Sequence, residues 1–187
     1  MEPTAKVVIV CWVVVTAFWV VSAFWVKRTK QRQPLRGRLL YMGLTVVVVI
    51  LLNPGIQKLH LNHAVLPHTL ATGILADVLV LLGSWLAIWA RAALGGNWSS
   101  RVTLKQGHEL IQRGPYRLIR HPIYSGLLLM VLGTAILVGR VSGFFALLMC
   151  FCAFWVKARQ EELLLTKHLP GYPEYMAHTK ALVPFVL

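Results

Sequence analysis

Long stretches without charged side chains limit most strongly what this chain can fold into. Residues 7–26, 39–56, 69–90, 123–139 and 141–156 are apolar runs, and Asp77 is the single charged residue within them. A helix needs roughly 20 apolar residues to cross a hydrocarbon core about 30 Å thick. The sequence therefore predicts an all-α, polytopic membrane protein of about five transmembrane helices.

The five runs form a single integral membrane domain over residues 1–187, with N-terminal helices at 7–26 and 39–56 and a catalytic core at about 69–187. The first run exceeds the apolar core of a secretory signal peptide, and its basic flank follows it, so we expect a retained helix. The last two runs are shorter, and the segment Gly-Arg-Val-Ser-Gly at 139–143 separates them. This spacing predicts a tight helical hairpin.

The basic residues indicate how the helices are oriented. The chain carries a formal net charge of +13, yet only 13% of its residues are charged and 57% are hydrophobic. Charge scattered between apolar runs does not form a nucleic-acid surface, and we expect membrane lipid as the partner instead. With the N-terminus outside, every lysine and arginine except Lys6, Lys58 and Arg140 falls on the cytoplasmic side, as the positive-inside rule requires. We expect a prokaryotic inner membrane because the chain is short and shows no further targeting signal.

Two polar segments, 91–122 and 157–187, fall on the cytoplasmic side, so any chemistry with a soluble cofactor belongs there. Neither the cysteines nor the histidines show metal-ligand spacing, and we predict no metal site. Asp77 lies deep in the third run, where an acid is costly; it either contacts a polar substrate head or bonds a neighbouring helix. The sequence carries no signal for an oligomeric state.

The segment 107–126 combines turn residues, aromatics and histidines immediately before a membrane helix. Pro122 suits the first position of that helix, which places His121 at the helix entrance. The N-terminus of a helix offers unpaired N–H groups and a partial positive charge, which favour an anion. The alternative is an ordinary loop with an interfacial aromatic belt.

The segment 157–165 continues the last helix out of the membrane. At helical spacing Lys157 and Glu161 are neighbours one turn apart. A solvated helix face with a salt bridge is the simple interpretation. Placement on the same side as the first segment makes a shared site the alternative, and Tyr172, Tyr175 and residues 183–187 would cap it.

The motifs of these segments form a recognisable set. Gly-Pro-Tyr-x3-Arg-His-Pro-x-Tyr-x-Gly at 114–126 is followed by Glu-Glu-x-Leu-Leu at 161–165, and by Tyr-x2-Tyr and Pro-Phe near the end. Together they resemble the isoprenylcysteine carboxyl methyltransferase family, with a more distant likeness to phospholipid methyltransferases. The resemblance covers roughly the C-terminal half, from Leu94 onward.

The resemblance implies that S-adenosylmethionine binds in a cytoplasmic pocket between the loop and the C-terminal helix. The residues that match the cofactor-lining positions are His108, Leu110, Ile111, Tyr116, His121, Pro122, Ile123, Tyr124 and Glu161. Eukaryotic members orient the substrate carboxylate with an arginine one turn before the glutamate. Lys157 stands there and keeps the charge without the two-pronged donor geometry, and Arg120 and Arg159 are alternative candidates.

The implied reaction is methyl transfer to a lipophilic or prenylated acceptor, foremost the carboxylate of an isoprenylcysteine-like substrate. A carboxylate is already ionised at neutral pH, whereas an ammonium or thiol must first lose a proton. The alternatives are a phospholipid amine or thiol acceptor, an NADPH-dependent membrane reductase on a related helical core, and a non-catalytic scaffold that binds anionic lipid.

Overall fold

The computed structural model describes residues 3–25, 35–53, 63–98 and 110–183, and these residues are helical with short connections. Five helices match the five predicted apolar runs, and a sixth short helix follows them. Their bounds are α1 Pro3–Ser22, α2 Leu35–Leu51, α3 Leu70–Leu94, α4 Pro122–Val138, α5 Val141–His168 and α6 Tyr172–His178. The all-α prediction is confirmed.

Three segments are long and apolar enough to cross a membrane. They are Thr4–Trp25, Leu70–Leu94 and Val141–His168, and Met42–Leu51 and Pro122–Val138 are shorter apolar helices among the described residues. The structure therefore supports an integral, multi-pass membrane protein with three long candidate spans and two shorter ones. Since α5 rises about 1.5 Å per residue over 28 residues, it exceeds a hydrocarbon core of about 30 Å.

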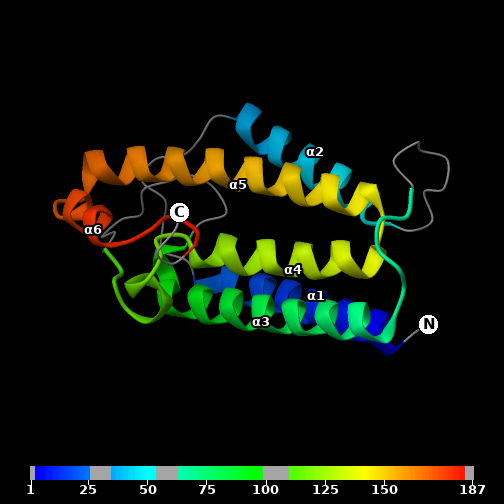
Figure 1. The fold of residues 1–187 in the computed structure, drawn as a ribbon. Coiled ribbons are helices and arrows are strands. Elements are labelled where there is room, and N and C mark those ends of the chain that lie inside the picture. The colour runs from blue at the N-terminus through cyan, green and yellow to red at the C-terminus, as the bar shows by residue number, and fades with distance from the viewer. Residues whose placement is uncertain (1–2, 26–34, 54–62, 99–109, 184–187) are drawn as a thin grey trace.

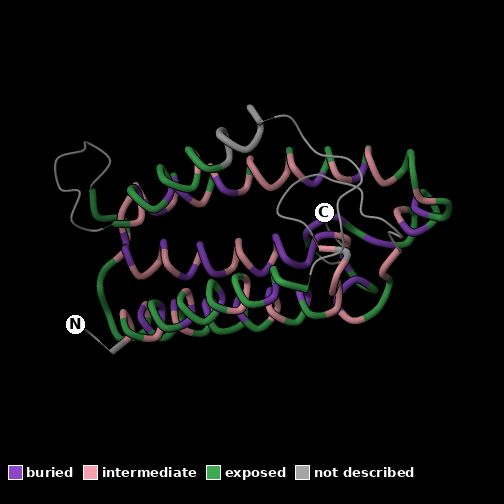
Figure 2. The backbone as a smooth tube through the Cα atoms, turned by 180° about the vertical axis from the view of Figure 1, so that it is seen from behind, coloured by how far each residue is buried: buried purple, intermediate pink, exposed green. Residues whose placement is uncertain are grey.

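Helix α4 lies at the centre of the bundle. It packs against α3 on one side and α5 on the other, and α1 and α2 lie beside α3 and α5 respectively (Figure 1). Every residue of α4 is buried or half-buried, whereas α1 and α3 expose many apolar side chains (Figure 2). These exposed apolar faces are typical of helices whose solvent is lipid.

Small residues let α3 and α4 approach each other closely. A Cβ atom at Gly126 would lie 2.7 Å from both the amide nitrogen of Ala87 and the carbonyl oxygen of Gly83. A Cβ atom at Gly133 would lie 2.6 Å from the carbonyl oxygen of Ala76. The two backbones are therefore in direct contact along the interface, as in membrane helix pairs with small residues at the crossing.

The helices alternate in direction, as the five-run prediction requires. Thr4 lies against Gly73 near the starts of α1 and α3, and the carbonyl oxygen of Ser22 accepts a hydrogen bond from Arg91 near their ends. Gly139 ends α4 at its C-terminus in a left-handed conformation, with φ of 63°. Its carbonyl accepts hydrogen bonds from the amides of Val65 and Leu66, which fixes the predicted hairpin between α4 and α5.

After α6 the chain folds back toward the start of α4. Residues 179–182, which we call the C-terminal strap, run beside residues 119–121 and form an isolated parallel bridge between Ile119 and Lys180. Ala181 and Leu182 in the strap are buried. The entrance of α4, the end of α5, α6 and the strap thus gather at one end of the bundle (Figure 1).

Candidate functional site

The entrance of α4 forms the floor of the candidate site. His121 is the N-cap residue and Pro122 the first residue of α4, as the sequence predicted. The preceding motif begins with a short 3-10 helix, Gly114–Arg117, whose Gly114 has a φ of 61°. Backbone hydrogen bonds from His121 and Arg120 to the strap then hold the chain in place as it enters the helix.

The two predicted segments meet at this end of the bundle. The Tyr124 hydroxyl donates a hydrogen bond of 2.7 Å to Oε1 of Glu161. Nδ1 of His121 lies 3.6 Å from Oε2 of the same carboxylate. Residues that are 37 positions apart in the sequence are thereby joined across the α4–α5 interface.

Aromatic rings line up beside this carboxylate. The rings of His121 and Tyr124 are stacked with centroids 5.3 Å apart, and Tyr124 stacks on Phe154 of α5 at 5.0 Å. Nζ of Lys157 lies 5.3 Å from the centroid of the Tyr124 ring. Tyr124 is therefore the point where the imidazole, the carboxylate and the ammonium converge, in an arrangement that suits cations and flat ligands.

Some of the remaining cofactor candidates belong to the hydrophobic cluster that contains Tyr124. Tyr116, Ile123 and Tyr124 are buried in one core cluster, and Ile111 packs against it. Pro122 is buried beside them, and Leu110 is half-buried. His108 lies outside the described residues.

The family comparison covers the helices that carry these groups. The sequence profile of the phospholipid methyltransferase family matches residues 71–170, slightly more than half of the chain. This chain belongs to the phospholipid methyltransferase family. The match includes His121, Tyr124, Lys157 and Glu161, and it ends before α6 and the strap.

Individual relatives of this family member align over part of their length. Two rice proteins, from Oryza sativa subsp. indica and subsp. japonica, are each described as a probable protein-S-isoprenylcysteine O-methyltransferase. Each is 28% identical over 113 residues, which is 58% of this chain and 59% of the rice chain. The uncharacterized protein YpbQ of Bacillus subtilis (strain 168) is 36% identical over 44 residues, 24% of this chain and 26% of its own.

The three basic residues that are candidates for orienting the substrate occupy different environments in this member of the phospholipid methyltransferase family. Arg120 leaves only 9% of its side chain exposed, its Nε lies 2.7 Å from Oε1 of Glu162, and its Nη1 donates to the carbonyls of Met176 and Thr179. Arg159 leaves 52% of its side chain exposed and lies 4.6 Å from the Trp155 ring centroid. Lys157 is the one of these three basic residues whose charged group lies over the ring of Tyr124, a candidate cofactor residue.

Sequence reasoning missed the role of Glu162. Its side chain is only 4% exposed, whereas that of Glu161 is 21% exposed. Oε1 of Glu162 accepts from Arg120, and Nε2 of His121 lies 3.4 Å from the same oxygen without forming a hydrogen bond. Both glutamates were recognised as part of the motif. Which partner each one contacts depends on the rotation of α5 about its axis, which the motif does not specify.

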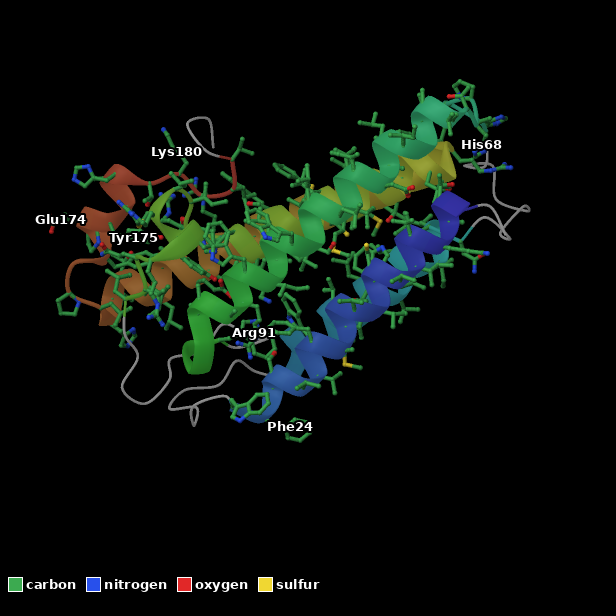
Figure 3. The ribbon with its side chains drawn as sticks, turned by 90° about the horizontal axis from the view of Figure 1, so that it is seen from below. Phe24, His68, Arg91, Glu174, Tyr175 and Lys180 are labelled. Carbon is green, nitrogen blue, oxygen red and sulfur yellow. The ribbon has the colours of Figure 1, made fainter. Side chains whose placement is uncertain are left out.

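Sequence reasoning also missed Arg91, which lies near the end of α3 toward α1 and Phe24 (Figure 3). It is 2% exposed, donates to the carbonyls of Ser22 and Gly95, and lies 4.4 Å from the Trp98 ring centroid. A buried arginine that bonds two chain carbonyls stabilises the local backbone. It fixes the end of α1 against the end of α3.

The buried tyrosines stay neutral. Burial raises the pKa of Tyr116 far above its usual range, and it raises the pKa of Tyr175 to about 12. The Tyr175 hydroxyl donates a hydrogen bond of 2.6 Å to the carbonyl of Tyr116. Neither phenol is therefore suited to accept a proton at neutral pH.

Proposed function

We propose that this protein is an S-adenosylmethionine-dependent methyltransferase that acts on a lipophilic acceptor at the membrane surface. The observation that carries the proposal is the hydrogen bond between Tyr124 and Glu161, because it joins the two motif segments into one site. Membership of the phospholipid methyltransferase family supports the same activity.

The side chains at the site suit the proposed cofactor. Bound S-adenosylmethionine would supply an electrophilic methyl group on a positively charged sulfur. The carboxylate of Glu161 offers acceptor oxygens for hydroxyl or ammonium groups of the cofactor. The stacked faces of Tyr124 and His121 add a surface that attracts cations and packs against flat rings.

The protein's contribution to the reaction is chiefly positioning. Holding two reactants in line can supply about 7 to 11 kcal/mol of a barrier. Glu161 would bind the cofactor, and the proposed lining residues His108, Leu110, Ile111, Tyr116, His121, Pro122, Ile123 and Tyr124 would orient it. No proton transfer is needed if the nucleophile is already an anion.

For the acceptor we propose the carboxylate of an isoprenylcysteine-like substrate. Lys157 lies one helical turn from Glu161 and places an ammonium beside the Tyr124 ring, where it would attract a carboxylate. The names of the rice relatives support the same acceptor. The family name supports a phospholipid as the second candidate, whose amine would need a base.

The decisive experiment incubates the purified protein with S-adenosylmethionine labelled in the methyl group and with a membrane lipid extract. We expect label in a lipid product whose mass has risen by about 14 daltons, one methylene. A carboxylate product releases its label on mild base hydrolysis, whereas an N-methyl product retains it. Absence of methyl transfer, together with protein-dependent hydride transfer from NADPH to a lipid of the same extract, would replace this proposal with a reductase.

A further inference from the structure

The two adjacent glutamates of α5 contact different parts of the site, and this division carries an inference that rests on the proposed function. Glu161 accepts a hydrogen bond from Tyr124 and keeps 21% of its side chain exposed. Glu162 is 3% exposed, and both of its oxygens are engaged by protein groups. Glu162 thus has little capacity left for a ligand.

The partners of Glu162 connect it to the C-terminal strap. Its Oε1 accepts from Nε of Arg120 at 2.7 Å. The same guanidinium donates to the carbonyl of Met176 at the end of α6 and to the carbonyl of Thr179, the first residue of the strap. One buried ion pair therefore links α5, the entrance of α4 and the strap.

The strap in turn holds the segment that carries His121. The amide of Arg120 donates to Lys180 at 2.8 Å, and the amide of His121 donates to Ala181 at 2.9 Å. The Ser125 hydroxyl donates to the carbonyl of Leu182. Because Leu182 packs in the core cluster of Tyr116 and Tyr124, a displaced strap would leave those rings without part of their support.

We propose that Glu162 is a positioning residue, which fixes the imidazole of His121 and, through Arg120, holds the strap against the site. Glu161 alone of the pair contacts the cofactor. The imidazole of His121 lies between the two carboxylates, with Nε2 3.4 Å from Glu162 and Nδ1 3.6 Å from Glu161, so each carboxylate borders one edge of the ring. This assignment extends the proposed site beyond the family match, which ends at residue 170.

The test compares Glu162→Gln and Glu161→Gln in the purified full chain by two measurements. Hydrogen–deuterium exchange of peptides covering residues 117–125 shows whether the strap remains bound to this segment. Calorimetric titration with S-adenosylhomocysteine measures the affinity of the site. For Glu162→Gln we expect exchange at the amides of Arg120 and His121 to rise about tenfold or more, and affinity to fall roughly tenfold. For Glu161→Gln we expect lost affinity with wild-type exchange.

Two results would overturn the assignment. Wild-type exchange in Glu162→Gln would show that the ion pair does not hold the strap. Faster exchange with unchanged affinity would reduce Glu162 to a structural role. If the wild-type protein binds no S-adenosylhomocysteine, the proposed function fails, and the exchange comparison still decides whether the ion pair holds the strap.

A second pair of variants covers the case in which Glu162→Gln does not fold. Replacing a buried ion pair with apolar residues is often neutral for stability, so the double variant Arg120→Met, Glu162→Met is expected to fold. It should show fast exchange in residues 117–125 and weak affinity, and wild-type exchange would contradict the proposal. Arg159→Met is the matched control, because that exposed partner of Glu162 contributes little and should leave exchange unchanged.

Discussion

Tyr124 connects the residues proposed to act in the site. Its ring stacks on His121 and on Phe154, its hydroxyl donates to Glu161, and Nζ of Lys157 lies 5.3 Å from its centroid. These contacts come from α4 and α5, which the hairpin at Gly139 places side by side. Charged neighbours on α5 can be replaced while the aromatic rings remain.

Replacing Glu161 with glutamine is expected to weaken binding of S-adenosylhomocysteine roughly ten- to a hundredfold, because a hydrogen bond to a charged group becomes a neutral one. Tyr124 can still donate to the amide oxygen, so the fold should be preserved. Calorimetric titration measures the affinity. Glu174→Gln, the same change at an exposed position of α6, is the control. Equal affinities in both variants would remove Glu161 from the site.

Replacing Lys157 with alanine is expected to lower kcat/KM for a carboxylate acceptor about tenfold or more while cofactor affinity stays unchanged, since the lost charge faces the acceptor. Lys157→Arg should retain most activity. The assay is initial-rate methyl transfer at varied acceptor concentration. Lys167→Ala, at an exposed lysine of the same helix, controls for loss of surface charge. A normal kcat/KM in Lys157→Ala would exclude the proposed contact.

At the scale of the elements, the α3–α4 interface determines where the site forms. Gly126 is one turn beyond Pro122 in α4, and its backbone lies against Gly83 and Ala87 of α3. An added side chain there would push the start of α4 away from α3. The same displacement would move Tyr124 relative to α5, so packing and site geometry are coupled.

We expect Gly126→Ala to destabilise the protein by about 1–3 kcal/mol, because its Cβ would lie 2.7 Å from backbone atoms. The midpoint of thermal unfolding in detergent should fall. Gly43→Ala is the matched control: a Cβ there meets nothing within 4 Å, and alanine is the better helix former. Gly43→Ala should therefore be neutral or slightly stabilising. Similar midpoints for both variants would contradict the close packing.

At the scale of the whole molecule, the two ends of the bundle differ. The proposed site, α6 and the strap occupy one end, and His68 lies at the other (Figure 3). The basic residues predict that the site end faces the cytoplasm and that the N-terminus lies outside. That orientation would give the site access to a soluble cofactor.

Labelling of single cysteines in intact cells tests this orientation. Cys11, Cys150 and Cys152 are first replaced with alanine, and a cysteine is introduced at His68 or Lys180. A membrane-impermeant maleimide should label His68→Cys in intact cells and Lys180→Cys only after the membrane is opened, because charged reagents do not cross lipid. The reverse pattern would invert the predicted topology.

Much of the fold could be predicted because the bilayer imposes a simple requirement on length and polarity. The apolar runs, Pro122 at the start of α4 and the tight turn at Gly139 all follow from local sequence. Tyr172 and Tyr175 of α6 were predicted as part of a cap, but the strap at residues 179–182 was not predicted, and residues 184–187 of the predicted cap lie outside the described residues. The exact course of α6 and the strap depends on Arg120, whose hydrogen bonds join residues more than 40 positions apart.

The site could be predicted as two segments but not as a set of contacts. Motif positions pointed to His121 and Glu161, and the helical period placed Lys157 beside the latter. The local sequence does not show whether Glu161 or Glu162 is the more deeply buried, since both are acidic neighbours in one helix. Only the rotation of α5 against α4 determines which carboxylate is buried.

The sequence by itself determined that this chain is helical and suited to lipid, because uncharged runs long enough to cross a bilayer leave few other structures. The tertiary structure decided which residues share a site. Tyr124, Glu161 and Lys157 meet because glycines bring α3 and α4 into backbone contact and α5 packs on the other side of α4. Such contacts depend on the relative rotation of whole helices, which no local pattern specifies.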